Sequence, residues 1–385
     1  MASLCTACVK VQSLKNAIVS LGGISGDCAV CGARGTVLMS CATPDFRARI
    51  LALVRFHYSE AEYNPLLGGE RLESIFLCEN PITDVQQHWN LDAYQQALAQ
   101  LFSDCRHDGA TRVDLFAGNV DTEQGQFFAL KRADDDRLRE LKHASFTRNH
   151  YLLHAEARAL LEPVAQRVER TLARESVFYR ARIGYAKSGF ARAGLFEGRH
   201  YTPFEGGALG APPPPFTAAG RMNRAGASFL YVATTPETAI AELCPHPGHY
   251  CSVGAFSARA TLRVCDLSLL DVTDFASNEQ LSDFLLLSSI DSCFSIPVLP
   301  ENRAEYHFPQ LLADVFRHLG YDGVGYRSSV GPGMNFAFFD PAAFSYQVGS
   351  AAVTKIEWLS YATTTLPVMS GDDGEYWTRA DGHLL

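Results

Sequence analysis

The sequence predicts an α+β fold, in which a mostly helical N-terminal domain with a small cysteine knuckle precedes a domain of small mixed or antiparallel sheets flanked by helices. Apolar residues recur at helical spacing in residues 46–56, 91–102 and 134–173. From Glu175 the pattern changes, because residues 177–183 alternate like a strand and short strands dominate thereafter.

These patterns divide the 385 residues into four parts. We expect a knuckle at 1–40, a helical domain at 41–174, a second domain at 175–365 and a flexible, acidic tail at 366–385. A hydrophobic content of 47% supports a buried core in a chain of this length.

Charge and cysteine content limit the environment and the partners. The net charge of -9 argues against nucleic acid or an anionic membrane as the main partner. No apolar run approaches the roughly 20 residues of a membrane span, and the N-terminus lacks a signal-peptide pattern. The odd number of cysteines, 11, fits a reducing compartment. We therefore expect a cytoplasmic protein.

Four of the cysteines are spaced as metal ligands. The pairs Cys5-x2-Cys8 and Cys28-x2-Cys31 are typical of two knuckles that hold one tetrahedral zinc ion. Gly32 and Gly35 follow the second pair, where such turns often need a positive φ. Because four sulfur ligands leave no open position, the zinc would be structural and not catalytic.

A helix after residue 234 carries the most unusual carboxylate. Thr235 is expected to cap it, Pro236 to occupy its first position and Glu237 to lie in its first turn. Glu242 then falls in the last turn, where a negative charge opposes the helix dipole. A solvated surface carboxylate remains the alternative interpretation of Glu242.

A basic turn precedes that helix. Residues 220–226 read Gly-Arg-Met-Asn-Arg-Ala-Gly, and a strand with Tyr231 follows at 229–233. A basic turn, a tyrosine on a strand and a carboxylate then lie within about one supersecondary unit. This layout is typical of a small active site, although the tyrosine ring could simply pack in the core.

The remaining elements follow from local patterns. Helices are expected at 277–290 and at 308–319, the second closed by Gly320. Strands are expected at 323–326, 334–339 and 353–361. The proline-rich segment 202–219 is expected to cross the surface as a loop outside the core.

The second domain resembles the RES family, named for an arginine, a glutamate and a serine. The resemblance covers about residues 176–344 and rests on an ordered set of motifs: Phe178-Tyr179-Arg180-Ala181-Arg182, Gly220-Arg221-Met222-Asn223-Arg224-Ala225-Gly226, Leu230-Tyr231, Ala241-Glu242 and Gly323-Val324-Gly325-Tyr326-Arg327-Ser328-Ser329, with Asn335 downstream. It implies a fold similar to ADP-ribosyltransferases, and a bacterial toxin of a toxin-antitoxin pair that consumes NAD by hydrolysis or phosphorolysis.

The resemblance assigns roles to matching residues. Arg180 would bind phosphate, with Arg182 on the same strand face as runner-up, and a surface salt bridge is the alternative for both. Tyr231 would face the nicotinamide, and Glu242 the reacting ribose. Ser328 would position the ligand, and the neighbouring serine leaves the register open by one.

Three further side chains are expected at the ligand. They are Arg221 and Asn223 of the basic turn and Ser329, the second of the two serines. The resemblance also implies NAD as substrate and an antitoxin or immunity protein as partner, and it leaves a homo-oligomer open. A related alternative is an ADP-ribosyltransferase that modifies a protein or another macromolecule.

The N-terminal half looks like the HEPN-type helical domain that precedes RES in some longer bacterial proteins. Arg148-Asn149-x4-His154 matches the arginine-polar-x4-histidine pattern of HEPN ribonucleases. RNA cleavage or nucleic-acid binding is therefore a second alternative, against which the acidic composition argues.

Overall fold

The structure is a computed structural model that describes residues 2–60, 70–103, 115–119, 129–193, 196–296, 305–360 and 363. The tail expected at 366–385 lies outside these residues. The α+β class is confirmed, because helices and sheets alternate through the described chain.

The N-terminal part is mixed and not mostly helical. Strands β1 (Ser3–Cys5), β2 (Ile24–Gly26) and β3 (Thr36–Ser40) form an antiparallel sheet in the order β1-β3-β2. Helices α1 (Gln12–Ser20), α2 (Pro44–His57), α3 (Leu72–Leu77) and α4 (Leu91–Leu101) accompany it. A second sheet has the order β4-β6-β5, from β4 (Tyr58–Glu60), β5 (Glu70–Arg71) and β6 (Leu115–Asn119).

The long helical stretch expected at 134–173 is two helices and a strand. Helix α5 (Asp136–Thr147) ends before Asn149, whose side chain accepts a hydrogen bond from Tyr151 N–H and so caps α6 (His150–Ala165). Strand β7 (Glu169–Leu172) then pairs with β13 (Leu262–Asp266). The C-terminal sheet therefore begins before residue 175.

A nine-stranded sheet forms the centre of the C-terminal part. Its strand order is β16-β12-β8-β11-β15-β14-β13-β7, and β17 also pairs with β12. The strands not yet given are β8 (Val177–Ile183), β11 (Leu230–Ala233), β12 (Tyr250–Ala258), β14 (Gly323–Arg327), β15 (Met334–Phe338), β16 (Phe344–Tyr346) and β17 (Ala352–Lys355). Only β13 and β14 pair in parallel among these neighbours.

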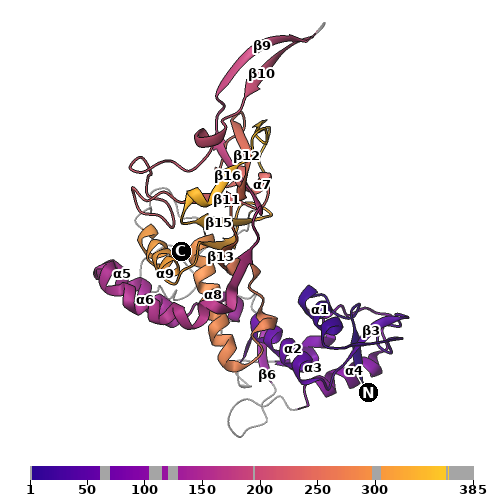
Figure 1. Ribbon diagram of the computed structural model, residues 1–385. Coiled ribbons are helices and arrows are strands. Elements are labelled where there is room, and N and C mark those ends of the chain that lie inside the picture. The colour runs from indigo at the N-terminus through magenta and orange to yellow at the C-terminus, as the bar shows by residue number, and fades with distance from the viewer. Residues whose placement is uncertain are drawn as a thin grey trace, which may run out of the picture.

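The two faces of this sheet bury different residues, because side chains alternate along a strand. One face carries an aromatic cluster in which the ring of Phe336 stacks on that of Phe338 at 5.7 Å and meets Phe178 edge-on. The other face packs against α7 (Pro236–Ala241), α8 (Asn278–Ser295) and α9 (His307–His318). Figure 1 shows α5 and α6 beside α9, with which α6 makes direct contact.

The proline-rich segment differs from its prediction. Strands β9 (Lys187–Ala193) and β10 (Phe196–Thr202) form a separate hairpin that projects from the body (Figure 1). The chain then returns, and Leu209 is only 1% exposed within the aromatic cluster. The prediction that segment 202–219 stays outside the core is therefore wrong for Leu209. The prolines lie on either side of this leucine and do not prevent its burial.

Among the described residues, short 3-10 helices include those at Leu130–Arg132, Gln166–Val168, Gly206–Ala208, Leu267–Leu269, Val272–Asp274 and Pro341–Ala343. The 3-10 helix at 272–274 contacts the N-terminal part. Helix α2 packs on it, and Arg49 donates a hydrogen bond to the Thr273 carbonyl at 2.9 Å. The N-terminal and C-terminal parts are therefore in direct contact.

Most expected helices and strands are confirmed. Helices α2, α4, α8 and α9 lie where the apolar spacing predicts them, and Gly320 follows α9 with φ +84°. Strand β17 ends at Lys355, so the strand expected at 353–361 is shorter than its pattern suggests.

The packing of the aromatic cluster can be tested by substitution. We predict that Phe336→Ala lowers the free energy of unfolding by about 3–5 kcal/mol, because the 1% exposed ring leaves a cavity among aromatic neighbours. Urea denaturation measures this loss. Phe190→Ala is the control, since that ring is 80% exposed on the hairpin and should change stability by less than about 0.5 kcal/mol. Equal losses in the two variants would contradict the packing described.

Candidate functional site

The helix that carries the candidate carboxylate is built as its sequence predicts. The Thr235 hydroxyl accepts a hydrogen bond from Thr238 N–H at 3.2 Å, and Pro236 occupies the first turn. The helix ends at Ala241, so Glu242 is its C-cap residue and is exposed. Cys244 follows with φ +46°, which turns the chain away.

Two polar side chains hold the Glu242 carboxylate. Its Oε1 accepts from the Ser328 hydroxyl at 2.7 Å and from the Asn335 side-chain amide at 2.6 Å. Ser328 follows β14, and Asn335 lies in β15. Among the residues that the structure describes, Oε2 has no hydrogen-bond partner. The carboxylate is thus oriented through one oxygen and open at the other.

Of the two neighbouring serines, Ser328 is the one that contacts Glu242. Its hydroxyl also accepts from the backbone N–H of Gly331 at 3.0 Å, which fixes its orientation. Ser329 is exposed. Asn335 is 4% exposed, so its amide is held firmly against the carboxylate.

Tyr231 is fixed by the basic turn that precedes its strand. Its hydroxyl accepts from Met222 N–H at 3.0 Å and donates to the Asn223 side-chain oxygen at 2.9 Å. Burial raises the pKa of Tyr231 to about 12, although the nearby guanidinium groups of Arg221 and Arg180 act in the opposite direction. The phenol is therefore neutral near pH 7.

The turn residues expected to touch a ligand are engaged within the protein. Asn223 is 2% exposed, and its amide donates to the carbonyl oxygens of Ala218, Arg224 and Ala227, each at 3.0 Å. Arg221 donates through Nη1 to the carbonyl oxygen of Phe294 at the end of α8. Both side chains shape the turn that carries the Tyr231 contact.

Arg180 lies where the sheet opens. Strands β8 and β11 pair at one position, between Tyr179 and Ala233. Beyond it the Arg180 side chain fills the opening, donating through Nη1 to the Tyr231 carbonyl at 2.7 Å and through Nε to the Leu209 carbonyl at 2.9 Å. Burial lowers the pKa of Arg180 to about 10, which still leaves the group charged near pH 7.

Arg182 lies two residues further on the same face of β8. It donates through Nη1 to the Ala208 carbonyl at 2.6 Å, and its guanidinium lies 4.4 Å from the centre of the Phe204 ring. The two arginines therefore line one side of β8, where they hold the returning segment 206–209.

The sequence-predicted residues form two groups, and Tyr231 contacts one of them through its main chain. Glu242, Ser328 and Asn335 make direct contact, and Arg180 is joined to the Tyr231 backbone. By strand alternation the Arg180 side chain starts from the face of the aromatic cluster, whereas the Tyr231 ring packs on the helical face. The Arg180 side chain therefore lies on the face of the aromatic cluster, whereas the Glu242 carboxylate is held by Ser328 after β14 and by Asn335 in β15.

One tyrosine between these groups escaped sequence reasoning. Tyr326 is 6% exposed in β14, and burial is the main reason why its pKa is raised well above its usual range. The charges of Tyr231 and Glu242 add to that effect, and Arg221 opposes it. Its sequence signal was its place in the motif Gly323–Ser329, two residues before Ser328.

The ribonuclease pattern has separate partners for its two residues. Arg148 is ion-paired with Glu156, with Nη1 and Oε2 3.0 Å apart, and both side chains are exposed. The ring of His154 meets that of His318 on α9 edge-on at 4.6 Å. The arginine is therefore on the surface, and the histidine belongs to the α6–α9 contact.

The four knuckle cysteines lie together. Their sulfur atoms are all within 4.8 Å of one another, with Cys5–Cys8 at 3.7 Å, Cys5–Cys31 at 3.5 Å and Cys8–Cys28 at 3.6 Å. With Zn–S bonds of about 2.3 Å, a tetrahedral site separates its sulfur atoms by about 3.8 Å. Gly32 and Gly35 have φ +74° and +59°, as the turn of the second pair requires. The donor set therefore fits a tetrahedral metal ion.

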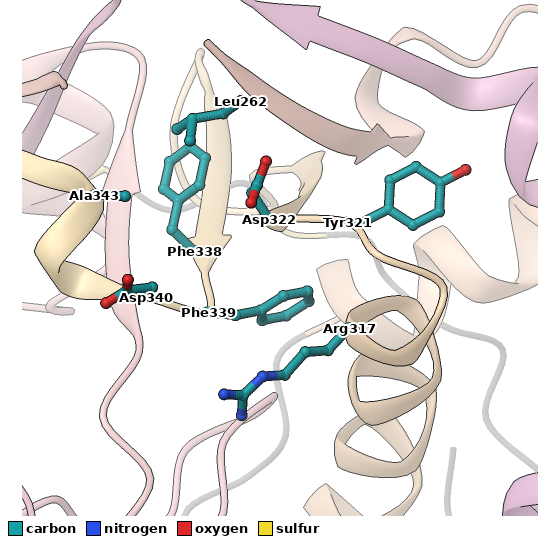
Figure 2. A pocket seen from close by; sticks show the side chains of 8 residues that line it. All are labelled: Leu262, Arg317, Tyr321, Asp322, Phe338, Phe339, Asp340 and Ala343. Carbon is teal, nitrogen blue, oxygen red and sulfur yellow. The ribbon is translucent and has the colours of Figure 1, made fainter. Parts of the chain in front are cut away.

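Two surface hollows lie elsewhere on the sheet. One, of about 180 Å³, lies between the sheet and the end of α9, and Figure 2 shows its lining residues Leu262, Arg317, Tyr321, Asp322, Phe338, Phe339, Asp340 and Ala343. The other, of about 580 Å³, is lined by Arg174, Glu175, Ser257, Ala258, Arg259, Ser345 and Gln347. Neither includes a predicted site residue.

Comparison with solved structures gives one weak likeness. The crystal structure of the M. tuberculosis MbcT–MbcA toxin–antitoxin complex contains a chain with 12% identity and a TM-score of 0.27, covering 51% of this chain and 92% of that one. No curated protein matches. No helix of the described residues is long and apolar enough to cross a membrane.

Comparison with protein families identifies the C-terminal part. The sequence model of the RES domain matches residues 190–358, which contain the basic turn, Tyr231, Glu242, Ser328 and Asn335. Arg180 and Arg182 precede the matched residues. Residues 190–358 of this chain are therefore similar to the RES domain.

Proposed function

We propose that this protein degrades NAD by cleaving the bond between nicotinamide and ribose, with water or phosphate as the acceptor. One observation carries the proposal: within a RES domain, the Glu242 carboxylate is oriented through Oε1 by two donors and is exposed at Oε2. Such a carboxylate can act on a ligand without first having to be ordered.

The chemistry needs a fixed negative charge. As the C–N bond breaks, its electron pair leaves with the nicotinamide nitrogen and positive charge develops on the ribose. Glu242 would stabilise that charge and orient the acceptor oxygen, which forms the new bond to the ribose carbon and gives up a proton to solvent. Ser328 and Asn335 would keep the carboxylate in place.

Arg180 is proposed to bind the pyrophosphate. Two of its three nitrogen atoms are occupied by main-chain carbonyl oxygens, whereas Nη2 has no protein partner among the residues described. A guanidinium held on one edge can still donate to phosphate from the other. Arg182 would be a second contact on the same face of β8.

Tyr231 is proposed to face the nicotinamide. Its phenol is neutral and its hydroxyl is bonded on both sides, so the ring has one fixed orientation. A flat aromatic ring in such a position suits a flat aromatic cation. Tyr326 would close this end of the site from β14, which β15 separates from the strand of Tyr231.

A charge-removing substitution tests the carboxylate. We predict that Glu242→Gln lowers kcat for NAD cleavage by about 10²–10³, because the amide keeps an acceptor for Ser328 and Asn335 but loses the charge. Nicotinamide release measures the effect, and thermal unfolding should be unchanged. Glu237→Gln, exposed in the first turn of the same helix, is the control and should retain full activity.

Product analysis decides between acceptors and tests the proposal as a whole. Phosphorus and proton spectra of NAD after reaction in phosphate buffer distinguish ADP-ribose from its phosphorylated form. If the wild-type protein releases no nicotinamide with or without phosphate, the proposed activity is wrong.

A second substitution tests the phosphate contact. We predict that Arg180→Lys raises KM for NAD about tenfold or more, since a lysine cannot bridge two carbonyls and a phosphate at once. Arg259→Lys is a matched control, because Arg259 also donates to a main-chain carbonyl, that of Phe344, at the far end of β12. A larger effect in Arg182→Lys would transfer the role to that residue.

The alternative activity is the transfer of ADP-ribose to a protein or another macromolecule by the same residues. Labelled NAD separates the two activities, because a transferase marks its target and a degrading enzyme leaves free product. The RES resemblance supports a toxin that acts in the cytoplasm and is restrained by an antitoxin or immunity protein, which is the partner we propose.

The knuckle is proposed to hold one structural zinc ion, with Cys5, Cys8, Cys28 and Cys31 as ligands. We predict about one zinc per chain by elemental analysis, and a loss of that zinc in Cys8→Ser together with a lower Tm, because metal binding contributes to folding. Cys41→Ser is the control: Cys41 is equally buried but lies outside the cluster, and its variant should keep the metal. Unchanged zinc in Cys8→Ser would refute the assignment.

A further inference from the structure

A buried glutamine on α9 holds the turn that fixes Tyr231. Gln310 is 8% exposed, and its Nε2 donates to the Gly220 carbonyl at 2.8 Å and to the Asn223 carbonyl at 3.0 Å. Both N–H groups of the Gln310 side-chain amide therefore donate hydrogen bonds to this turn. Neither carbonyl belongs to a helix or a strand of the sheet.

The turn behind these carbonyls has little freedom of its own. A Cβ atom at Gly220 would lie 2.3 Å from the Asn223 side-chain oxygen and 3.1 Å from the Tyr231 hydroxyl. The Gly220 N–H also donates to the Asn223 carbonyl at 2.9 Å. Gln310, the turn and the Tyr231 hydroxyl are thus one close-packed hydrogen-bonded unit.

The same helix supplies a second anchor one turn further on. Asp314 Oδ2 accepts from Arg224 through Nε at 3.1 Å and Nη2 at 2.9 Å. Residues four apart share a helix face, so Gln310 and Asp314 hold Gly220, Asn223 and Arg224 of the turn from one side. The position of the turn is therefore set by α9.

We propose that Gln310 is a positioning residue that acts through Tyr231. By fixing the carbonyls of Gly220 and Asn223, it sets the place of Met222 N–H and of the Asn223 side chain, which together orient the phenol. This inference rests on the proposed function for its catalytic meaning, since Tyr231 is the group assigned to the nicotinamide.

The substitution Gln310→Met keeps the length of the side chain and removes both donors. The Asn223 carbonyl retains its bond from Gly220 N–H, so the turn should loosen without unfolding. Val315→Ala is the control, because Val315 is fully buried on the same helix and its truncation also weakens the core, with no contact to the turn among those described.

Two measurements test the inference. With NAD as substrate, we expect Gln310→Met to lower kcat/KM about tenfold and Val315→Ala less than about twofold. In the Tyr231→Phe background, Gln310→Met should change kcat/KM by less than about twofold, because the hydroxyl through which it acts is gone. If the losses of the two single variants multiply in the double variant, Gln310 does not act through Tyr231.

The second measurement is independent of NAD. In protein labelled with fluorotyrosine, the Tyr231 resonance is identified by its absence in Tyr231→Phe. It should shift or broaden in Gln310→Met and stay in place in Val315→Ala. An unchanged resonance overturns the inference whether or not NAD is cleaved, whereas a shifted resonance without NAD cleavage supports the positioning role and removes only the proposed function.

Discussion

The opening between β8 and β11 is the constraint around which the C-terminal part is organised. The two strands share one paired position, and the Arg180 guanidinium replaces the missing ladder by bonding to the Tyr231 carbonyl. A buried charge in that place is stable because two carbonyl oxygens accept from it. Strand β11 then leads directly into α7, whose C-cap residue is Glu242.

The polar side chains of the candidate site differ in what they bond to. Ser328 and Asn335 orient a carboxylate whose second oxygen is open, which suits chemistry. Asn223 donates its side-chain amide to three main-chain oxygens, and Arg221 donates through Nη1 to one. A motif matched by residue type cannot distinguish a ligand contact from a backbone contact, because both use the same amide or guanidinium. The structure distinguishes the two kinds of contact, because it shows which side-chain donors already bond to main-chain oxygens.

Local patterns predicted what is decided locally. The cap of α7 by Thr235, the φ of Gly320 and the four clustered cysteines all depend on short stretches of chain, and each was readable from sequence. Contacts between distant segments were not. Gln310 lies about ninety residues from the turn it holds, and no apolar period marks an amide that faces inward. The sequence of β7 has a helical apolar pattern, and the segment is extended because it pairs with β13. Leu209 is buried by tertiary packing although prolines lie on either side of it.

The contact between α2 and the 3-10 helix at 272–274 has a consequence for the chain as a whole. A single continuous apolar core runs from Leu4 and Phe46 through Leu161 to Phe308 and Tyr326, crossing every boundary that composition suggests. The cysteine-bearing part and the C-terminal part are therefore expected to unfold together as one cooperative unit. A fragment cut at residue 175 would expose the inner sides of α8 and α9 to water and favour self-association, so the N-terminal part covers apolar surface of the C-terminal part.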